Sequence, residues 1–291
     1  MSYDIDTHFH EGTSTFTHVL SDIATGQCAI IDPVLDYDPA SGCTDTVFID
    51  GVLDSIAARA GNLVFVLETH AHADHLSAGD YIRTKTGAKV VIGHDIQGVQ
   101  EVFAGLYNED DSFQRDGSQF DLLVREGDEL SLGQTKLTVM ATPGHTPACL
   151  SYLVAEDGKV QDAFVGDTLF MPDVGTARCD FPGGDAATLY DSIQRLMALG
   201  DDVTLHLCHD YPPVKRAIVS KVTVAEQRAN NIHVGDAHSR DDFIAMRRKR
   251  DSGLAMPRLI LPSLQVNIRA GALPEAESNG TRYLKVPLNQ F

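Results

Sequence analysis

The chain has no tryptophan, few basic residues and no long apolar segment among its 291 residues. Its apolar runs are short of the roughly 18 residues that cross a bilayer. Residues 1–6 also lack the basic and apolar stretches of a signal peptide. These absences argue against a membrane-spanning or secreted protein, so we expect a cytoplasmic protein that does not bind membranes.

Basic residues are outnumbered: 23 lysines and arginines face 41 aspartates and glutamates, which gives a net charge of −18. A field of this sign repels nucleic acids and anionic lipid surfaces, so neither is an expected partner. A small anionic substrate would need arginine or lysine side chains close to its binding site. Individual basic residues near candidate functional residues are therefore informative.

Cysteine is present but forms no recognisable framework. The five cysteines are odd in number, widely spaced and without a C-x-x-C pair, which is typical of reduced thiols. Hydrophobic residues make up 43% of the chain, enough for one large core or two modest ones. No composition shift marks a boundary, so we expect a single domain over 1–291, with a helical and irregular extension from about 213. The cysteines are Cys28, Cys43, Cys149, Cys179 and Cys208.

The first half of the chain alternates strand-like and helical patterns. Apolar runs typical of buried strands occur at 28–32, 63–67 and 89–92. Residues 77–80 resemble a capping box, which predicts a short helix that ends near Gly87. The alternation predicts an α/β fold.

A group of short strands follows and predicts a second sheet. Asp185 then caps a predicted helix that ends at Gly200, and 203–207 returns as a strand. Two further helices are expected at roughly 218–230 and 240–250, before a tail without strong periodicity. The strands of this second sheet are expected at 121–124, 136–140, 150–154 and 163–165.

Three histidines and an aspartate fall within six consecutive positions shortly after the strand predicted at 63–67. In an extended chain, residues two apart point the same way, so His70 and His72 can face one metal ion. Asp74 and His75 lie at the following bend and can reach its far side or a neighbouring ion. The alternative is a solvated polar loop, but this density of ligand types in one segment favours a metal site.

Three further motifs place ligand-type side chains after strand-like runs. Each motif alone is typical of a turn or a surface residue. In combination they favour a metal site, because imidazole and carboxylate groups suit borderline and harder divalent ions. No cysteine stands at a ligand position, which argues against a structural thiolate zinc site. The motifs are Thr142-Pro143-Gly144-His145-Thr146, Gly166-Asp167-Thr168-Leu169 and Cys208-His209-Asp210-Tyr211.

The order H-x-H-x-D-H, P-G-H-T, G-D-T-L and H-D-Y resembles the metallo-β-lactamase superfamily over most of the chain. This resemblance implies an αββα sandwich, in which two mixed β-sheets pack face to face with helices outside. The implied metal ligands are His70, His72 and His145 in a first site, Asp74, His75 and His209 in a second, and Asp167 as a bridge.

Within the superfamily, the chain is most similar to the persulfide dioxygenases, a branch that includes the mitochondrial sulfur dioxygenase, and next to the glyoxalase II thioesterases. Residues 166–169 and 176–181, followed by the H-D-Y motif, resemble the dioxygenase pattern, and 226–231 and 264–269 resemble its bacterial members. The branch implies one Fe(2+) per chain on a 2-His-1-carboxylate face. The implied iron ligands are His70, His145 and Asp167, whereas His72, Asp74, His75 and His209 would orient them or form a second site.

The resemblance also implies the remaining site residues. Tyr211, His209 and Asp74 are the expected catalytic groups beside the metal. Glutathione carries two carboxylates, so basic residues of these motifs are candidates for binding it. The branch further implies a homodimer or other homo-oligomer. The substrate-binding candidates are Arg178, Arg228 and Arg269, each with a plain surface ion pair as the alternative, and Tyr211 as a hydroxyl donor.

The expected function is Fe(II)-dependent oxidation of glutathione persulfide with O2 and water to sulfite and glutathione, a step of sulfide metabolism. The main alternative is a glyoxalase II-like hydrolase, in which two metals activate a hydroxide that cleaves a glutathione thioester. All seven ligands for that reaction are present. A non-catalytic protein, either a metal-binding sensor or a degenerate scaffold, is a third alternative. Metal analysis separates them: one iron, two zinc or manganese ions, or none.

Overall fold

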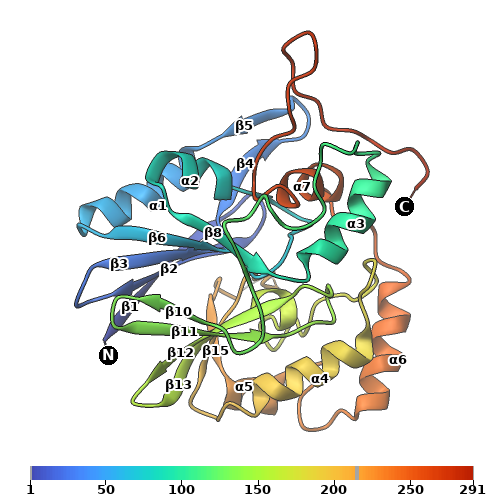
Figure 1. The fold of residues 1–291 in the computed structure, drawn as a ribbon. Coiled ribbons are helices and arrows are strands. Elements are labelled where there is room, and N and C mark those ends of the chain that lie inside the picture. The colour runs from blue at the N-terminus through green and yellow to red at the C-terminus, as the bar shows by residue number, and fades with distance from the viewer. Residues whose placement is uncertain (1, 214–215, 291) are drawn as a thin grey trace.

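The computed structural model describes residues 2–213 and 216–290. Two six-stranded β-sheets lie face to face, and helices cover the outer face of each sheet (Figure 1). Both sheets contain parallel and antiparallel strand pairs. The αββα sandwich with mixed sheets, predicted from the sequence, is therefore confirmed.

The first sheet has the strand order β1-β2-β3-β6-β8-β9, and a small sheet of order β5-β4-β7 lies beside it. The strands of the first sheet are β1 (Tyr3–His10), β2 (Thr15–Asp22), β3 (Gln27–Ile31), β6 (Asn62–Leu67), β8 (Lys89–Gly93) and β9 (Leu122–Val124). Those of the small sheet are β4 (Val34–Asp38), β5 (Cys43–Asp45) and β7 (Leu76–Ser77).

The second sheet has its strands in sequence order, from β10 to β15. Because β12 runs antiparallel to both β11 and β13, and β13 is parallel to β14, three of its strands end at the same edge. The strands are β10 (Glu129–Leu132), β11 (Thr135–Ala141), β12 (Leu150–Glu156), β13 (Lys159–Phe164), β14 (Thr204–His206) and β15 (Lys221–Thr223).

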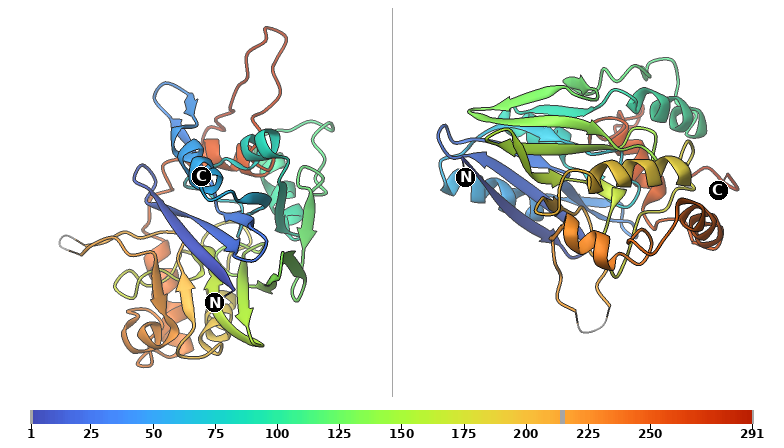
Figure 2. Two further views of the ribbon diagram at one scale, coloured as in Figure 1. Left: turned by 90° about the vertical axis from the view of Figure 1, so that its left-hand side faces the viewer. Right: turned by 90° about the horizontal axis from the view of Figure 1, so that it is seen from below.

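The helices divide into two outer layers. One layer covers the first sheet, and the other covers the second sheet, where it faces the viewer in Figure 2, right. The first layer consists of α1 (Val47–Ala58), α2 (Gly79–Thr86), α3 (Ile96–Leu106) and α7 (Ile260–Asn267). The second consists of α4 (Ala186–Met197), α5 (Val224–Asn230) and α6 (Arg240–Asp251), and a short 3-10 turn, η1 (Gly166–Thr168), follows β13.

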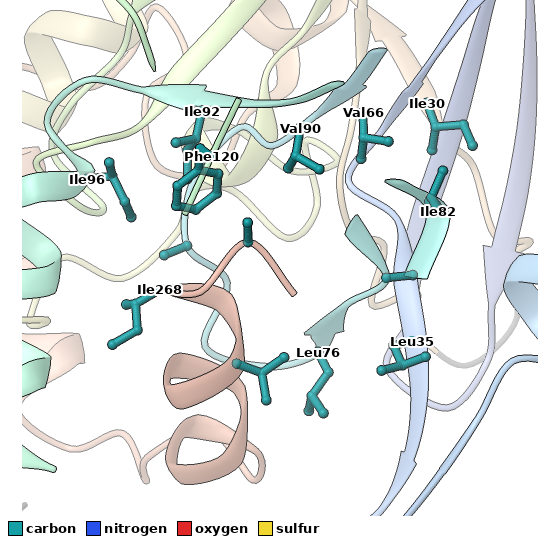
Figure 3. Close-up of a cluster of buried hydrophobic side chains, with 14 of the residues drawn as sticks. Ile30, Leu35, Val66, Leu76, Ile82, Val90, Ile92, Ile96, Phe120 and Ile268 are labelled. Atoms are coloured by element: carbon teal, nitrogen blue, oxygen red, sulfur yellow. The ribbon is translucent and has the colours of Figure 1, made fainter. Parts of the chain in front are cut away.

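Both faces of the central strands are covered, which explains their continuous apolar sequence. Ile30 of β3 and Val66 of β6 belong to the core between the first sheet and its helices, together with Ile82 of α2 (Figure 3). Their neighbours Ile31 and Leu67 belong to the core between the two sheets. Side chains alternate between the faces of a strand, so a strand buried on both faces lacks a polar alternation.

Two sequence predictions about the sheets need correction. β1 and β2 were not predicted, although they pair over their whole length. β9 was expected in the second sheet but pairs in parallel with β8 of the first, with Val91 opposite Leu122. Strand order in a sheet is decided by long-range pairing, and the position of a short strand along the chain does not reveal it.

The predicted helix at 218–230 is a strand followed by a helix. β15 pairs with β14, with Leu205 opposite Val222, and Thr223 then forms a capping box with Glu226 at the start of α5. The predicted capping box at 77–80 does not form, because the Ser77 hydroxyl donates to Glu68 and α2 begins without a side-chain cap. The helix itself ends at Gly87, at a φ of +78°, as predicted.

The extension after about residue 213 packs into both outer cores. Val224 of α5 and Phe243 of α6 lie in the core under the second sheet, and Leu264 of α7 lies in the core over the first. The sequence missed α7 because most of its residues are buried, which leaves no polar stripe. We propose that 1–291 form one domain. Among the described helices, none is long and apolar enough to cross a membrane.

Candidate metal centre

The histidine-rich segment leaves the first sheet at the end of β6. Its histidines are almost completely buried, with His70 1% exposed and both His72 and His75 inaccessible. The segment is irregular rather than extended, and the rings of His70 and His72 have centroids 4.0 Å apart. A solvated polar loop is therefore excluded for these side chains.

Three other ligand-type residues follow strands that end at one edge of the second sheet. His145 follows β11, Asp167 follows β13 and His209 follows β14. The backbone links this edge to the histidine-rich segment, because the Leu150 amide donates to the Thr69 carbonyl at 2.9 Å. The four sequence motifs thus meet at one place between the two sheets.

His70, His145 and Asp167 form one compact group, which we call the triad. Their ligand atoms lie within 4.8 Å of one another. The Asp167 Oδ2 atom is 3.9 Å from His70 Nε2 and 3.7 Å from His145 Nε2. Two imidazoles and one carboxylate on three separate segments match the ligand set of a facial triad.

His72, Asp74, His75 and His209 form a second group, which we call the quartet. Their ligand atoms also lie within 4.8 Å of one another. His209 Nε2 is 3.1 Å from Asp74 Oδ2, and His75 Nδ1 is 3.4 Å from Asp74 Oδ1. The structure therefore places His72 with the quartet, whereas the superfamily pattern groups it with His70 and His145.

Both groups contain buried polar atoms that form no hydrogen bond within the described part of the chain. Burying such atoms without a partner costs free energy, and a divalent cation bound to either group would give the atoms that face it a partner. The donor set therefore fits a metal ion. The atoms are His70 Nε2, His72 Nδ1, both ring nitrogens of His75, His209 Nε2 and Asp167 Oδ1.

Hydrogen bonds to the other ring nitrogens orient the imidazoles. His145 Nδ1 donates to the Arg178 carbonyl at 2.7 Å, which leaves Nε2 free of a proton. His72 Nε2 lies 3.0 Å from the buried carboxylate of Asp32, which leaves Nδ1 as the ligand atom. The Thr69 hydroxyl donates to Asp32 and contacts His70 Nδ1 at 3.1 Å. Such partners fix ring orientation and raise ligand basicity.

The two groups differ in charge. Burial and neighbouring imidazoles hold the pKa values of His70 and His72 well below the usual range, so both rings are neutral and able to coordinate. Burial raises the pKa of Asp167. Burial opposes ionisation of Asp74 and His209, but their mutual attraction holds the pKa of Asp74 well below its usual value and raises that of His209. The quartet therefore carries an internal ion pair.

A cavity of about 430 Å³ opens onto this centre, and its lining includes Asp74, His145 and Asp167. Tyr211 also lines it and stacks on His209, with ring centroids 5.7 Å apart and an interplanar angle of 14°. A cavity of this size that reaches both groups suits a small-molecule substrate.

Comparison with known proteins decides the family. The model of the metallo-beta-lactamase superfamily matches residues 22–209. This chain belongs to that superfamily. The four motifs that carry the resemblance lie within the matched residues or at their end, so the sequence-based assignment is confirmed.

Several relatives have names that indicate function. The chain is 50% identical to a probable metallo-hydrolase of Burkholderia pseudomallei, over 98% of this chain and 99% of that one. It is 46% identical to glyoxylase B2 of Dictyostelium discoideum, over 95% of this chain and 94% of that one. It is 28% identical to the human mitochondrial persulfide dioxygenase ETHE1, over 90% and 87%. The crystal structure of ETHE1 from Myxococcus xanthus superposes with a TM-score of 0.72 and 31% sequence identity. The match covers 92% of this chain and all of that one.

Among the arginines predicted to bind substrate, only Arg178 lines the cavity at the metal centre. Its Nε and Nη2 atoms each lie 2.6 Å from an Asp180 carboxylate oxygen, and Nη1 donates to the Ala255 carbonyl at 2.7 Å. Its guanidinium is therefore already paired.

Arg228 and Arg269, the other two predicted substrate-binding arginines, do not line this cavity. Arg228 Nε lies 3.1 Å from Asp201, and its Nη2 donates to the Met197 carbonyl at the end of α4. Arg269 pairs with Glu109 at 2.5 Å, away from the cavity. The resemblance compared residues along the chain, whereas α5 and α7 direct these side chains to other neighbours.

Three cavity-lining arginines escaped the sequence analysis. Arg247 of α6 is buried, with 2% exposure, and the exposed Arg250 and Arg258 follow it along the chain. Arg250 and Arg258 form no ion pair with any residue that the structure describes. The sequence did contain a signal, because residues 247–250 are four consecutive basic residues in an acidic chain.

Proposed function

We propose that this protein is an Fe(II)-dependent persulfide dioxygenase. Its substrate is glutathione persulfide, which it converts with O2 and water into glutathione and sulfite. The observation that carries the proposal is the compact group of two imidazoles and one carboxylate, His70, His145 and Asp167, which does not include His72. The likeness to ETHE1 in sequence and in structure supports the same conclusion.

A 2-His-1-carboxylate face suits the proposed reaction. His70, His145 and Asp167 would hold the iron, which would supply the redox chemistry that lets O2 oxidise the persulfide sulfur. The reaction balances as one persulfide, one O2 and one water giving one thiol and one sulfurous acid. The two sulfur atoms together give up four electrons, and O2 accepts them.

Residues of the quartet and Tyr211 would handle protons beside the triad. His209 Nε2 lies 3.4 Å from Asp167 Oδ1 and 3.1 Å from Asp74, so a proton on this ring faces both carboxylates. Tyr211 is 46% exposed, but desolvation at its hydroxyl, followed by the charges of Asp74 and Asp167, raises its pKa well above its usual value. Its hydroxyl therefore stays protonated and can donate a hydrogen bond to an anionic substrate.

The charge of the cavity wall supports an anionic substrate such as glutathione. Arg247, Arg250 and Arg258 place three cations on the lining of one cavity in a chain of net charge −18. Guanidinium groups bind carboxylates through paired hydrogen bonds. Arg247 is buried and paired with Asp251, so Arg250 and Arg258 replace Arg228 and Arg269 as the proposed partners of the two glutathione carboxylates.

A two-metal hydrolase is the second candidate, and two observations favour it. The Dictyostelium relative is named a glyoxylase. In addition, His72 Nδ1 forms no hydrogen bond with any residue that the structure describes, and it belongs to the quartet, as a ligand of a second metal would. In that case, a hydroxide activated by two metals would cleave a glutathione thioester.

One experiment separates the two reactions. The protein is purified with iron supplied, and its metal content is measured beside its activity on two substrates. We expect one iron per chain, O2 uptake and sulfite release in equal amounts from glutathione persulfide, and no cleavage of S-lactoylglutathione. Two tightly bound zinc ions with rapid anaerobic thioester cleavage would establish the hydrolase instead.

A cytoplasmic location and a homodimer belong to the same proposal. Both derive from the sequence and from the resemblance to the dioxygenase branch. Light scattering coupled to gel filtration measures the assembly directly, and a monomeric mass would contradict the predicted pairing.

A further inference from the structure

The wall of the metal centre contains a buried segment without regular secondary structure, residues 176–179. Thr176, Ala177 and Cys179 are each less than 10% exposed. A segment without helix or strand hydrogen bonds must satisfy its backbone groups elsewhere when it is buried. Its partners therefore show what holds it in place.

This segment contacts the triad through one backbone atom. The Arg178 carbonyl accepts the hydrogen bond from His145 Nδ1 at 2.7 Å. Because a carbonyl only accepts, the proton is fixed on Nδ1 and the lone pair of Nε2 faces the triad. The position of this carbonyl thus determines both the tautomer and the direction of the His145 ring.

Helix α6 holds the segment at both of its ends. Arg247 Nη1 donates to the Thr176 carbonyl at 3.0 Å, and the Cys179 amide donates to Asp251 Oδ2 at 2.9 Å. Arg247 Nη2 also donates to Asp251 Oδ1, which joins the two contacts into one unit. Arg247 and Asp251 are one helical turn apart and are 2% and 6% exposed.

The two ends of the segment have few other fixed partners. The Thr176 amide donates to His233 Nδ1 at 3.0 Å, and the Arg178 side chain reaches the Ala255 carbonyl. Arg247 and Asp251 therefore supply the contacts that flank the Arg178 carbonyl on both sides. A buried ion pair is weak evidence for stability by itself, but it specifies one arrangement of the groups that it touches.

We propose that the Arg247–Asp251 pair positions a metal ligand: by clamping residues 176–179, it fixes the Arg178 carbonyl and thereby the orientation of His145. The two residues are positioning residues and would act on the metal through His145. This inference rests on the metal-binding role proposed for His145, but it holds for either reaction.

The test compares metal affinity in the apoprotein loaded with Co2+, with a chelator as competitor and the Co2+ absorption spectrum as a second readout. The double variant Arg247→Met/Asp251→Leu removes both buried charges together. We expect it to bind Co2+ about 10- to 100-fold more weakly, as for other hydrogen-bonding partners of metal ligands. Arg248→Met, an exposed position on the same helix, is the control and should bind Co2+ like the wild type.

Two further measurements keep the inference falsifiable if the double variant fails to fold. Arg247→Lys retains the buried charge but loses the forked donor geometry, so it should also weaken Co2+ binding and change its spectrum. In the metal-free protein, the downfield proton signal of His145 Nδ1, assigned by its loss in His145→Ala, should shift or broaden in Arg247→Lys. Wild-type affinity together with an unchanged proton signal in folded Arg247→Lys would overturn the inference.

The same experiment separates this inference from the proposed function. If the wild-type protein does not bind Co2+, the metal role of His145 fails. If the wild type binds Co2+ and every folded Arg247 variant binds it equally well with an unchanged His145 Nδ1 proton signal, the positioning role alone fails.

Discussion

The triad and the quartet consist of the same residue types, yet they differ in how they are satisfied without a metal. In the quartet, His209 Nε2 and Asp74 Oδ2 lie 3.1 Å apart, so a protonated His209 ring balances the charge of the Asp74 carboxylate. In the triad, Asp167 lies 3.7 and 3.9 Å from its two imidazoles, beyond hydrogen-bond distance. The triad carboxylate therefore lacks a close imidazole partner within its own group, and we expect metal to bind there first.

The two groups also differ in how they are built. Three of the four quartet residues lie within 72–75, so local geometry brings them together. The triad residues come from the ends of β6, β11 and β13, which belong to both sheets. The triad therefore depends on the packing of the whole sandwich, and its geometry is sensitive to residues far away in sequence.

The largest expected effect is the loss of iron from triad variants. His145→Ala or Asp167→Ala should weaken iron binding more than about 100-fold, because a direct ligand contributes more than its hydrogen-bonding partners, whose loss costs about 10- to 100-fold. Metal analysis after dialysis against a chelator measures this change, and circular dichroism controls for folding. Full iron content in either variant would remove the distinction between the two groups.

A smaller effect on activity is expected from substitution of Arg250 and Arg258, which line the cavity that reaches both groups. Arg250→Met/Arg258→Met should lower kcat/KM for glutathione persulfide by about 5- to 150-fold, since a lost charged hydrogen bond costs roughly 1–3 kcal/mol. The effect should fall mainly on KM, with iron content unchanged. Arg228→Met, outside the cavity, is the matched control, and equal kinetics in both proteins would contradict the proposed carboxylate sites.

Acid stability should depend on a histidine outside both groups. Burial, then the nearby His206, lowers the pKa of His18 to about 3, whereas the unfolded chain has a value near 6.5. Between these two pH values the unfolded state binds more protons than the folded state. The contribution of neutral His18 to the free energy of unfolding is therefore fully present above about pH 6.5 and is lost as the pH falls toward 3. His18 contributes up to about 1.4 kcal/mol per pH unit in this window.

Urea unfolding at several pH values measures the contribution of His18. In His18→Gln, an amide replaces the ring nitrogen that contacts the Leu207 carbonyl at 2.9 Å, and no group titrates at this position. The slope of stability against pH should therefore be smaller in His18→Gln than in the wild type. Equal slopes would show that His18 does not remain neutral in the folded protein.

The smallest effect is expected from the quartet. His75→Ala should leave iron stoichiometry unchanged, because the triad contains every proposed iron ligand. The variant also removes one ligand of the alternative second metal, so it should abolish binding of a second zinc ion if one occurs. Parallel loss of iron in His75→Ala and His145→Ala would mean that the two groups form one shared site.

Several local features could be predicted because they depend on neighbours in sequence. Asp185 caps α4 by accepting the Thr188 amide at 2.8 Å, as its position before an amphipathic helix predicts. β3, β6 and β8 were located because strands buried on both faces form continuous apolar runs. α7 was not predicted, because a helix buried on most sides has no polar stripe to reveal its period.

The sequence by itself determined the family, the types of metal ligand and their order along the chain, since motifs of fixed spacing are local properties. Only the tertiary structure decided which candidate ligands lie together, since it places His72 in the quartet. It also decided which basic residues line the cavity: Arg247, Arg250 and Arg258 do, whereas Arg228 and Arg269 do not. The physical reason is that a side chain's partners depend on the packing of α5, α6 and α7, and packing is set by contacts between residues far apart in sequence.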